Sequence, residues 1–298
     1  MNRLLMVLLM STAVSTAHTG DRLFPFYELT DEMLATIDIH DGFIDEWYDV
    51  GEPSMTVLDC RTWRDEVLPD PSNLDFRIWL AWHDESNRIF FAIAAIDDDY
   101  VNTHDRSSGN LGQTLMYEHD SIAFQLDADH SGGTGHRNET PAEEYPIIFG
   151  RTQQYTAVAQ TASGPLLGEG TLGSGEPSSW KINPPYGDAG GGVHGENPTM
   201  WVIEFYVTPQ NAWGEGPENT FFSDLEANQI VGFVAIVRDR DFTKGSIWKP
   251  SSIQDDENPF QLDRGYADIF VDGLLLPDRS TAVEDVTWGR IKASLQVD

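Results

Sequence analysis

The stretch Ile39-His-Asp-Gly-Phe-Ile-Asp-Glu-Trp47 sets the pattern that the rest of the chain repeats. Asp41-Gly42 is a turn signal, because glycine tolerates a positive φ and an aspartate side chain can bond its own backbone. Apolar residues lie on both sides of this turn, so we expect two short β segments here, with Trp47 as a core anchor. The same alternation of apolar runs and acidic turns recurs downstream at regular intervals.

Period-two alternation of apolar residues predicts β strands along most of the chain. Residues 75–83 alternate between two faces, and the continuous apolar run 89–96 is typical of a central strand covered on both sides. A polar turn joins these two runs, so we predict a hairpin. Further strands are predicted at 53–58, 120–126, 147–149, 155–159, 201–207, 230–237 and 266–270. The fold class that follows is all-β: an antiparallel two-sheet β-sandwich with a jelly-roll-like topology.

The remaining segments divide the chain into one domain with two appendages. Residues 18–36 are a lead-in with a short helix, for which Thr30 is the N-cap. The sandwich occupies residues 37–276 and carries a Gly-rich insertion, 164–195, with too many glycines and prolines for regular structure. Residues 277–298 are expected to form a short C-terminal helix, which either docks on the domain or tethers the protein to the cell envelope.

The N-terminal residues 1–17 are typical of a secretion signal, with Arg3 before a short apolar run and small residues ahead of cleavage near Ala17. No later apolar run is long enough to span a bilayer, so we expect a secreted or periplasmic protein without an integral membrane segment. The 18 basic and 49 acidic residues give a formal charge of −31. A field of this sign repels phosphate backbones, which argues against nucleic-acid binding. The single Cys60 is expected to be a buried, inert thiol.

Several of these segments together resemble a known family. Residues 41–47, the hairpin that ends in Asp97-Asp98-Asp99, and the stretch 119–127 are similar to the family 9 carbohydrate-binding modules and to their wider β-sandwich superfamily, which includes the DOMON haem- or sugar-binding domains. Residues 201–207 and 232–237 fit the same order. The resemblance covers residues 37–272 and implies a sandwich that binds sugar, held in the family between two Trp rings.

Sugar recognition needs aromatic rings that cover the apolar C–H face of the sugar, and polar groups that bond its hydroxyls. Rings in loops have less core to fill than rings in strands. The predicted ligand residues are therefore Trp180, Tyr186, Trp213 and Trp248, with Asn197 as a hydroxyl-bonding amide. The leading hypothesis is a non-catalytic protein that binds a poly- or oligosaccharide and needs no organic cofactor. A structural or interaction module of the cell envelope is an alternative.

A calcium site is a further hypothesis. Asp127-x-Asp129-x-Ser131-Gly132 has the oxygen spacing of the first half of a calcium loop, and Asp97 and Asp99 are nominated as additional ligands. Calcium bound there would be structural. The alternative is that these residues form an acidic β-turn.

Two other chemistries remain as alternatives. A haem-binding redox domain, implied by the DOMON likeness, would use Met116 with His83 or His119 as axial ligands. Glycoside cleavage needs two carboxylates across a cleft. With 49 acidic residues some pair satisfies any spacing, so the sequence does not discriminate. If the protein is an enzyme, we expect a glycoside hydrolase or an accessory domain of one.

Overall fold

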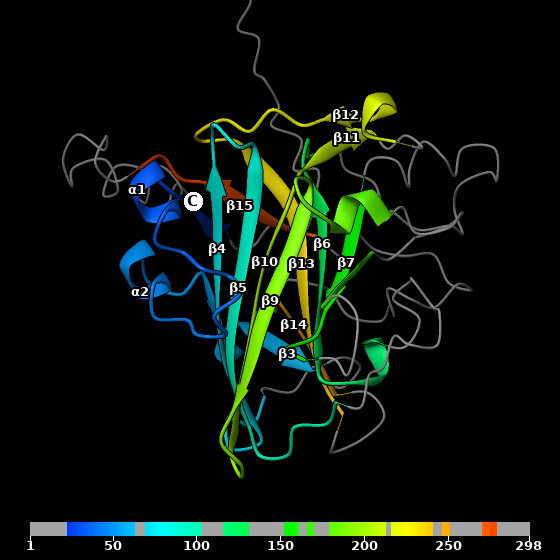
Figure 1. Cartoon of the computed structure of the whole chain (residues 1–298). Helices are drawn as coiled ribbons and strands as arrows, with labels where there is room; N and C mark the ends of the chain where they lie inside the picture. The colour runs from blue at the N-terminus through cyan, green and yellow to red at the C-terminus, as the bar shows by residue number, and fades with distance from the viewer. Residues whose placement is uncertain are drawn as a thin grey trace, which may run out of the picture.

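The computed structural model describes residues 23–62, 69–102, 116–130, 152–160, 166–169, 179–212, 216–240, 246–250 and 270–278. The predicted signal peptide and nearly all of the predicted C-terminal tail lie outside these residues. The described strands form two facing layers (Figure 1). The prediction of an all-β sandwich is confirmed.

Hydrogen bonds set the order of the strands in each layer. One layer runs β8 (Leu167–Glu169), β7 (Thr152–Ala157), β6 (Ser121–Asp127), β13 (Ile230–Asp239) and β15 (Val271–Leu275), and β14 (Ser246–Pro250) pairs with β13 and with β3 (Cys60–Thr62). The other layer runs β4 (Leu74–His83), β5 (Arg88–Asp97), β10 (Thr199–Val207) and β9 (Gly187–His194), and β2 (Met55–Thr56) pairs with β4.

Strand β1 (Leu23–Glu28) joins the two layers. Its first four residues pair with β15 and its last two pair with β4, in both cases parallel. The other pairings among the described strands are antiparallel. The parallel pairings of β1 are thus the exception to the antiparallel arrangement that the sequence predicts.

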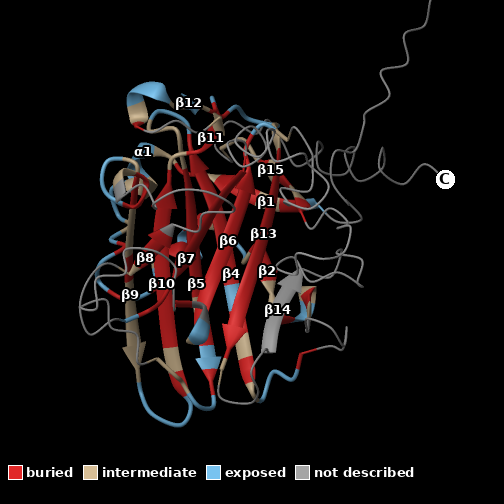
Figure 2. Cartoon of the chain, turned by 90° about the vertical axis from the view of Figure 1, so that its right-hand side faces the viewer, coloured by how far each residue is buried: buried red, intermediate tan, exposed pale blue. Residues whose placement is uncertain are grey.

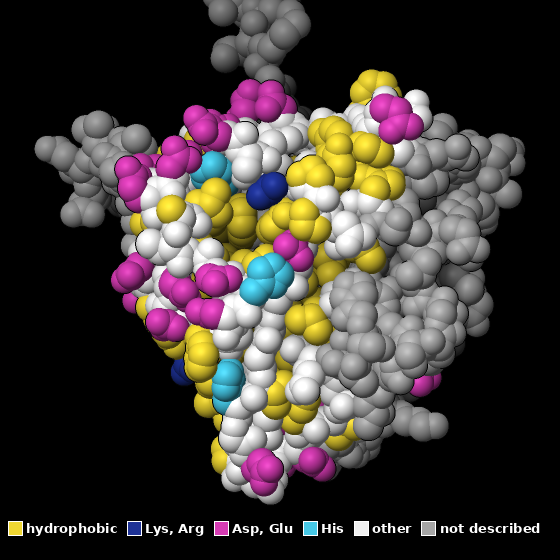
Figure 3. Space-filling model, viewed as in Figure 1, with side chains coloured by type: hydrophobic (Ala, Val, Ile, Leu, Met, Phe, Trp, Pro, Cys, Tyr) yellow, Lys and Arg dark blue, Asp and Glu magenta, His cyan; other side chains and the backbone are white. Residues whose placement is uncertain are grey.

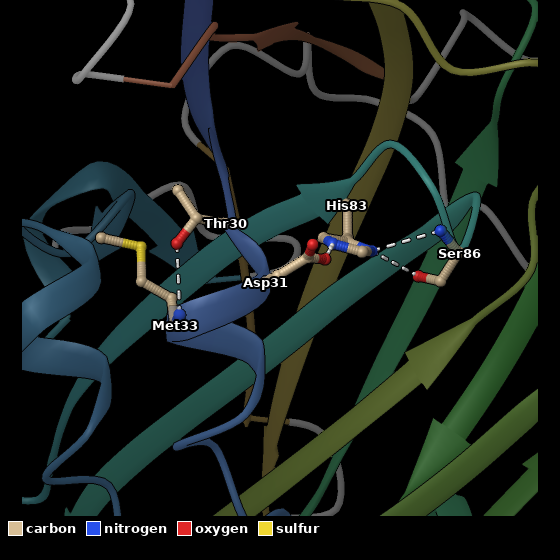
Figure 4. Close-up of polar contacts among 5 residues, drawn as sticks. All are labelled: Thr30, Asp31, Met33, His83 and Ser86. Atoms are coloured by element: carbon tan, nitrogen blue, oxygen red, sulfur yellow. Dashed lines mark hydrogen bonds and ion pairs between the residues drawn. The ribbon is translucent and has the colours of Figure 1, made fainter.

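Helical structure is short in the described part of the chain. It consists of α1 (Asp31–Leu34), α2 (Trp47–Val50) and the 3₁₀ helices Val57–Asp59, Met116–Glu118, Ser179–Ile182 and Pro217–Asn219. The predicted N-cap of α1 is confirmed, because Thr30 Oγ1 accepts a hydrogen bond from the Met33 amide at 3.2 Å (Figure 4). No helix in the described ranges has the length and apolar character needed to cross a membrane.

The core lies between the two layers and is rich in phenylalanine. Phe91 and Phe205 stack in one layer with centroids 4.8 Å apart, and both rings meet Phe124 of the other layer. Figure 2 shows the central strands buried along most of their length. Each fully buried large apolar side chain stabilises the fold by roughly 1.5–3 kcal/mol. Cys60 is buried, as expected.

The predicted hairpin is confirmed as β4 and β5, which pair over ten residues each from Leu74–Asp97 to His83–Arg88. Strand β5 also pairs with β10, so it is a central strand, as its continuous apolar run indicates. Its two faces alternate in the expected way. Phe91 and Ile93 enter the core between the layers, while Phe90 and Ala92 face outward and join a second apolar cluster.

The opening stretch 39–47 does not form the two β segments that we expected. It belongs to a segment, residues 29–51, that crosses the outer face of the β4-β5-β10-β9 layer and carries α1 and α2 (Figure 1). Trp47 is an anchor, as predicted, but it lies fully buried under this segment at the start of α2. The reason is that the outer face of the layer is itself apolar and needs a cover.

The prediction of irregular structure for the Gly-rich insertion is wrong at β9, which pairs with β10 through eight residues. A Cβ added at Gly190 would lie 1.5 Å from the Ile39 carbonyl oxygen, and one at Gly192 would lie 2.6 Å from the Gly42 oxygen. The glycines therefore let the backbone of segment 29–51 rest directly on the strand. They serve close packing rather than a loop.

Smaller differences concern strand boundaries. The last described strand is β15, Val271–Leu275, which begins where the predicted strand 266–270 was expected to end. Gly273 is needed there because a Cβ would meet the Phe26 ring at 2.4 Å. Residues 266–269 lie outside the described residues. The predicted strand 53–58 shortens to β2, which is followed by a 3₁₀ helix.

Candidate functional site

An aromatic cluster lies at the end of the sandwich where β10 ends and β9 begins. Trp180 comes from a 3₁₀ helix, Tyr186 directly precedes β9, and Phe222 lies in β12 (Phe221–Phe222), which pairs with β11 (Gln210–Ala212). The Tyr186 and Phe222 rings stack with centroids 5.6 Å apart and planes 3° apart. Trp180 meets Tyr186 edge-on at 4.9 Å. The structure thus brings two predicted ligand residues together with Phe222, which the sequence pattern did not single out.

This aromatic cluster is partly open to solvent. Trp180, Tyr186 and Phe222 are half-buried, and the neighbouring Phe221 is 74% exposed. Figure 3 shows hydrophobic side chains gathered at this end of the face. Aromatic rings left in contact with water at one place on a surface mark a site of interaction more often than single exposed residues do. The Phe221-Phe222 pair, set in a polar loop, was the signal in the sequence that could have revealed it.

A hollow lies beside the aromatic cluster, on the outer face of the β4-β5-β10-β9 layer. In Figure 3 its floor is hydrophobic, and basic, acidic and histidine side chains lie around it. Cross-strand register places Phe90, Tyr206 and Asp188 in one row on this face. The Phe90 and Tyr206 rings are 5.7 Å apart, and both belong to the apolar cluster under segment 29–51.

Arg88 connects the hollow to the aromatic cluster. Its guanidinium carbon lies 4.1 Å from the centroid of the Tyr206 ring, a cation–π contact. Its Nη2 donates a hydrogen bond to the Pro185 carbonyl, directly before Tyr186, at 2.9 Å. Burial raises the pKa of Tyr206, and the Arg88 charge acts against that rise while Asp188 adds to it. Arg88, Tyr206 and Tyr186 therefore form one continuous wall.

The other side of the hollow carries a polar pair. His40, from segment 29–51, places Nε2 3.1 Å from Asp188 Oδ2, and Asp188 also accepts from the Ala189 amide at 2.9 Å. The His40 side chain is 57% exposed and that of Asp188 is 28% exposed. Both side chains therefore present polar atoms to solvent, beside Tyr206 on the outer face of the layer. They are spaced 148 residues apart in the chain, so no local sequence pattern could have paired them.

His83 fixes the start of α1 against the turn between β4 and β5 (Figure 4). The Ser86 amide donates to His83 Nδ1 at 3.2 Å, so Nδ1 is an acceptor and Nε2 carries the proton. Nε2 then donates to Asp31 Oδ1 at 3.1 Å. This contact holds segment 29–51 in place beside the hollow.

A buried carboxyl group holds the same segment at its centre. Glu204 of β10 is fully buried, and its Oε1 accepts a hydrogen bond from Trp47 Nε1 at 2.6 Å. Its Oε2 has no hydrogen-bond partner among the described residues. Burial raises the pKa of Glu204 to about 8, and the negative charges of Glu46, Asp41 and Asp38 add to the rise. Glu204 is therefore mainly protonated at neutral pH.

The other predicted ligand residues lie elsewhere. Asn197 is exposed in the turn between β9 and β10 with φ 49°, at the far end of β9 from Tyr186. The eight residues of β9 separate the two by about 25 Å. Trp248 lies on β14 in the other layer, and Trp213 lies outside the described residues. The aromatic cluster thus forms without Asn197 and Trp248.

The nominated calcium ligands do not meet at one point. Asp97, at the end of β5, accepts from Trp201 Nε1 at 3.1 Å and from the Asp99 amide at 3.3 Å, which makes this an acidic turn. Asp127 pairs with Thr152 and Gly232 at the end of β6. Within the described ranges, no group of three or more His, Cys, Asp or Glu side chains is arranged to hold a metal.

The separation of Asp97 from Asp127 follows from the strand directions. Asp120, directly before β6, accepts from the Val101 amide and so lies near the end of β5. Asp127 lies at the opposite end of β6, about 20 Å away. Ser131 lies outside the described residues. Calcium bound by Asp127 and Asp129 stays a prediction.

The nominated haem ligands are also not placed as an axial pair. Met116 and His119 lie in one turn, joined by a hydrogen bond from the His119 amide to the Met116 carbonyl, so they cannot approach a haem from opposite faces. His83 lies at the other end of the β4–β5 hairpin and is engaged with Asp31 and Ser86.

Comparison with known proteins gives likeness at the level of the fold. No family model matches this sequence, and neither does any curated protein. Among solved structures, the chain is similar to a family 9 carbohydrate-binding module from Caldicellulosiruptor kristjanssonii in complex with glucose, with a TM-score of 0.48 and 11% identity over 88% of this chain and 100% of that one. It is also similar to a candidate carbohydrate-binding protein from Bacteroides uniformis, with a TM-score of 0.46 and 12% identity over 85% of this chain and 99% of that one. The first carries the name of the family that residues 37–272 resemble.

Proposed function

We propose that this chain is an exported, non-catalytic carbohydrate-binding protein and that its saccharide lies along the wall formed by the aromatic cluster and the hollow. The observation that carries the proposal is the aromatic cluster itself. Trp180, Tyr186 and Phe222 come from three separate segments, and all three residues are only half-buried. A purely structural cluster would bury these rings in the core, as the sandwich does with Trp79, Trp82 and Trp201.

The two parts of the wall supply the two kinds of contact that a sugar needs. The C–H face of a pyranose ring packs on an aromatic ring, and Tyr186, Phe222 and the exposed Phe221 offer such surfaces. Hydroxyl groups need fixed donors and acceptors close by. The His40 and Asp188 pair supplies acceptors, because a neutral His40 that donates Nε2–H to Asp188 keeps Nδ1 as an acceptor and the carboxylate also accepts. The guanidinium of Arg88 supplies donors.

Rigid strands support this arrangement. Asp188 is the second residue of β9, and Tyr206 lies in β10, so their backbones are held in the hydrogen-bond ladder of the sheet. Tyr186 is tied to the same ladder, because its carbonyl accepts from the Thr208 amide at 2.8 Å. A site that is already formed loses less conformational entropy when it binds a ligand.

Affinity electrophoresis in gels that contain soluble polysaccharides tests the proposal. We expect the wild-type protein to be retarded by at least one glycan, neutral or anionic, and Tyr186→Ala and Phe222→Ala to weaken that binding roughly tenfold each, as expected for a central aromatic contact. Tyr48→Ala is the matched control, because Tyr48 is 58% exposed on α2 and packs edge-on against Trp79, away from the aromatic cluster. Retardation by no glycan, or equal binding by Tyr186→Ala, Phe222→Ala and Tyr48→Ala, would overturn the proposal.

A further inference from the structure

Arg88 uses one ring and one carbonyl oxygen of the described residues to hold its guanidinium, and most of its N–H donors have no hydrogen-bond partner among those residues. The group lies over the Tyr206 ring, and one of its N–H donors is used by the Pro185 carbonyl. A guanidinium has five N–H donors in a planar fork. The cation–π contact and the hydrogen bond to Pro185 together hold this fork beside the aromatic cluster.

No carboxylate of the described residues neutralises this charge within the 4.0 Å that defines an ion pair. The lack of a partner is notable in a chain with 49 acidic and 18 basic residues. Asp188, which is in register with Tyr206, is the acid placed on this part of the face, and it is engaged with His40 and with the Ala189 amide. By contrast, Arg77 on the same face of β4 lies 3.9 Å from Asp75.

The chemistry of a stacked, unpaired guanidinium favours an oxyanion. Its fork matches a carboxylate or a sulfate with two parallel hydrogen bonds, and these charge-assisted bonds are stronger than those made to a hydroxyl. The aromatic surfaces beside it lower the local dielectric constant, which strengthens the interaction further. An ammonium group lacks both the fork and the planar stacking surface.

We infer that Arg88 recognises an anionic group on the bound saccharide, either the carboxylate of a uronic acid or a sulfate ester. The inference rests on the proposed saccharide site and names its ligand class. The formal charge of −31 opposes the approach of a long polyanion. That repulsion is screened over about 8 Å at physiological salt, so a short oligosaccharide with one anionic group at Arg88 meets little of it.

Isothermal titration of the full chain with matched ligands tests this inference. The first pair is tri-galacturonic acid and its methyl ester, which differ in charge but not in the sugar ring. The second pair is a sulfated galactan trisaccharide and its desulfated form. Each is titrated into the wild type, Arg88→Gln, Arg88→Lys and the control Arg77→Gln, whose side chain is 48% exposed on the same face.

We expect the wild type to bind the anionic member of one pair with roughly tenfold higher affinity than the neutral member. Whether this is the galacturonate pair or the sulfated pair identifies the anionic group as a carboxylate or a sulfate. Arg88→Gln should reduce that ratio to about one, Arg88→Lys should retain only part of it, and Arg77→Gln should keep it. The inference is overturned if the wild type binds both members of each pair with equal affinity. It is also overturned if Arg88→Gln loses affinity for both members of a pair to the same extent. If neutral glycans retard the protein while none of the four ligands binds, the inference fails and the proposed function stands. Binding to no glycan of any kind overturns both.

Discussion

Replacing Glu204 with glutamine should remove a large pH dependence from the stability of this protein. Glu204 is fully buried, and its pKa is raised from 4.5 to about 8. The folded state therefore holds the proton more tightly than the unfolded chain does. The resulting stabilisation is complete below pH 4.5 and is lost as the pH rises through about 8. Over this interval the loss amounts to roughly 5 kcal/mol, at 1.36 kcal/mol per pH unit.

Glutamine keeps the hydrogen bond from Trp47 Nε1, because its amide oxygen can accept in place of Oε1. It cannot ionise, so the free energy of unfolding of Glu204→Gln should lack this decline. Guanidinium denaturation followed by tryptophan fluorescence at about pH 5, 7 and 9 measures the difference between variant and wild type. We expect this difference to move in favour of Glu204→Gln by about 1.4 kcal/mol for each pH unit up to about 8.

The comparison with wild type separates Glu204 from the other acidic groups, whose titration is common to both proteins. Glu85→Gln, at an exposed position in the turn after β4, is the control and should follow the wild type at each pH. A difference between Glu204→Gln and wild type that stays constant from about pH 5 to 9 would refute the reasoning, because it would mean that Glu204 ionises normally in the folded protein.

Two further substitutions test how the layers are packed. Gly190→Ala should lower the melting temperature by several degrees, because its Cβ would meet the Ile39 carbonyl oxygen at 1.5 Å. The control Ala189→Gly, at the neighbouring residue on the opposite face of β9, should lower the free energy of unfolding by no more than about 1 kcal/mol. Equal effects of the two substitutions in thermal unfolding would contradict the close contact. Phe233→Ala should lower the free energy of unfolding by about 3–5 kcal/mol in chemical denaturation, because the Phe233 ring contacts the rings of Phe24, Phe26 and Phe124. A decrease below about 1 kcal/mol would show that this core is not tightly packed.

The sequence alone predicts the strands whose apolar pattern is local. The alternation in 75–83 and the apolar run in 89–96 identify β4, β5 and their hairpin, because side-chain period and burial are coupled in a strand. It does not predict β9. Three adjacent glycines, 190–192, give no apolar pattern, and the role of Gly190 and Gly192 becomes visible only when segment 29–51 is seen lying on them.

The candidate site, like the fold, is predicted in part by the sequence and set in part by the tertiary structure. Loop position marks Trp180 and Tyr186 as ring surfaces with little core to fill, and the structure brings them together. Asn197 was predicted as an amide that bonds sugar hydroxyls at the same site, yet β9 carries it to the other end of the sandwich. Phe222 joins the aromatic cluster through the pairing of β12 with β11, which the sequence does not reveal.

What the sequence by itself determined is the class of fold, since period-two hydrophobicity is a property of neighbouring residues. What only the tertiary structure decided is which distant residues share a surface: Arg88 over Tyr206, His40 beside Asp188, and Trp47 over Glu204. Strand order, register and the course of segment 29–51 set these contacts. They are decided by packing over long sequence separations, where a one-residue change of register would turn each side chain to the opposite face.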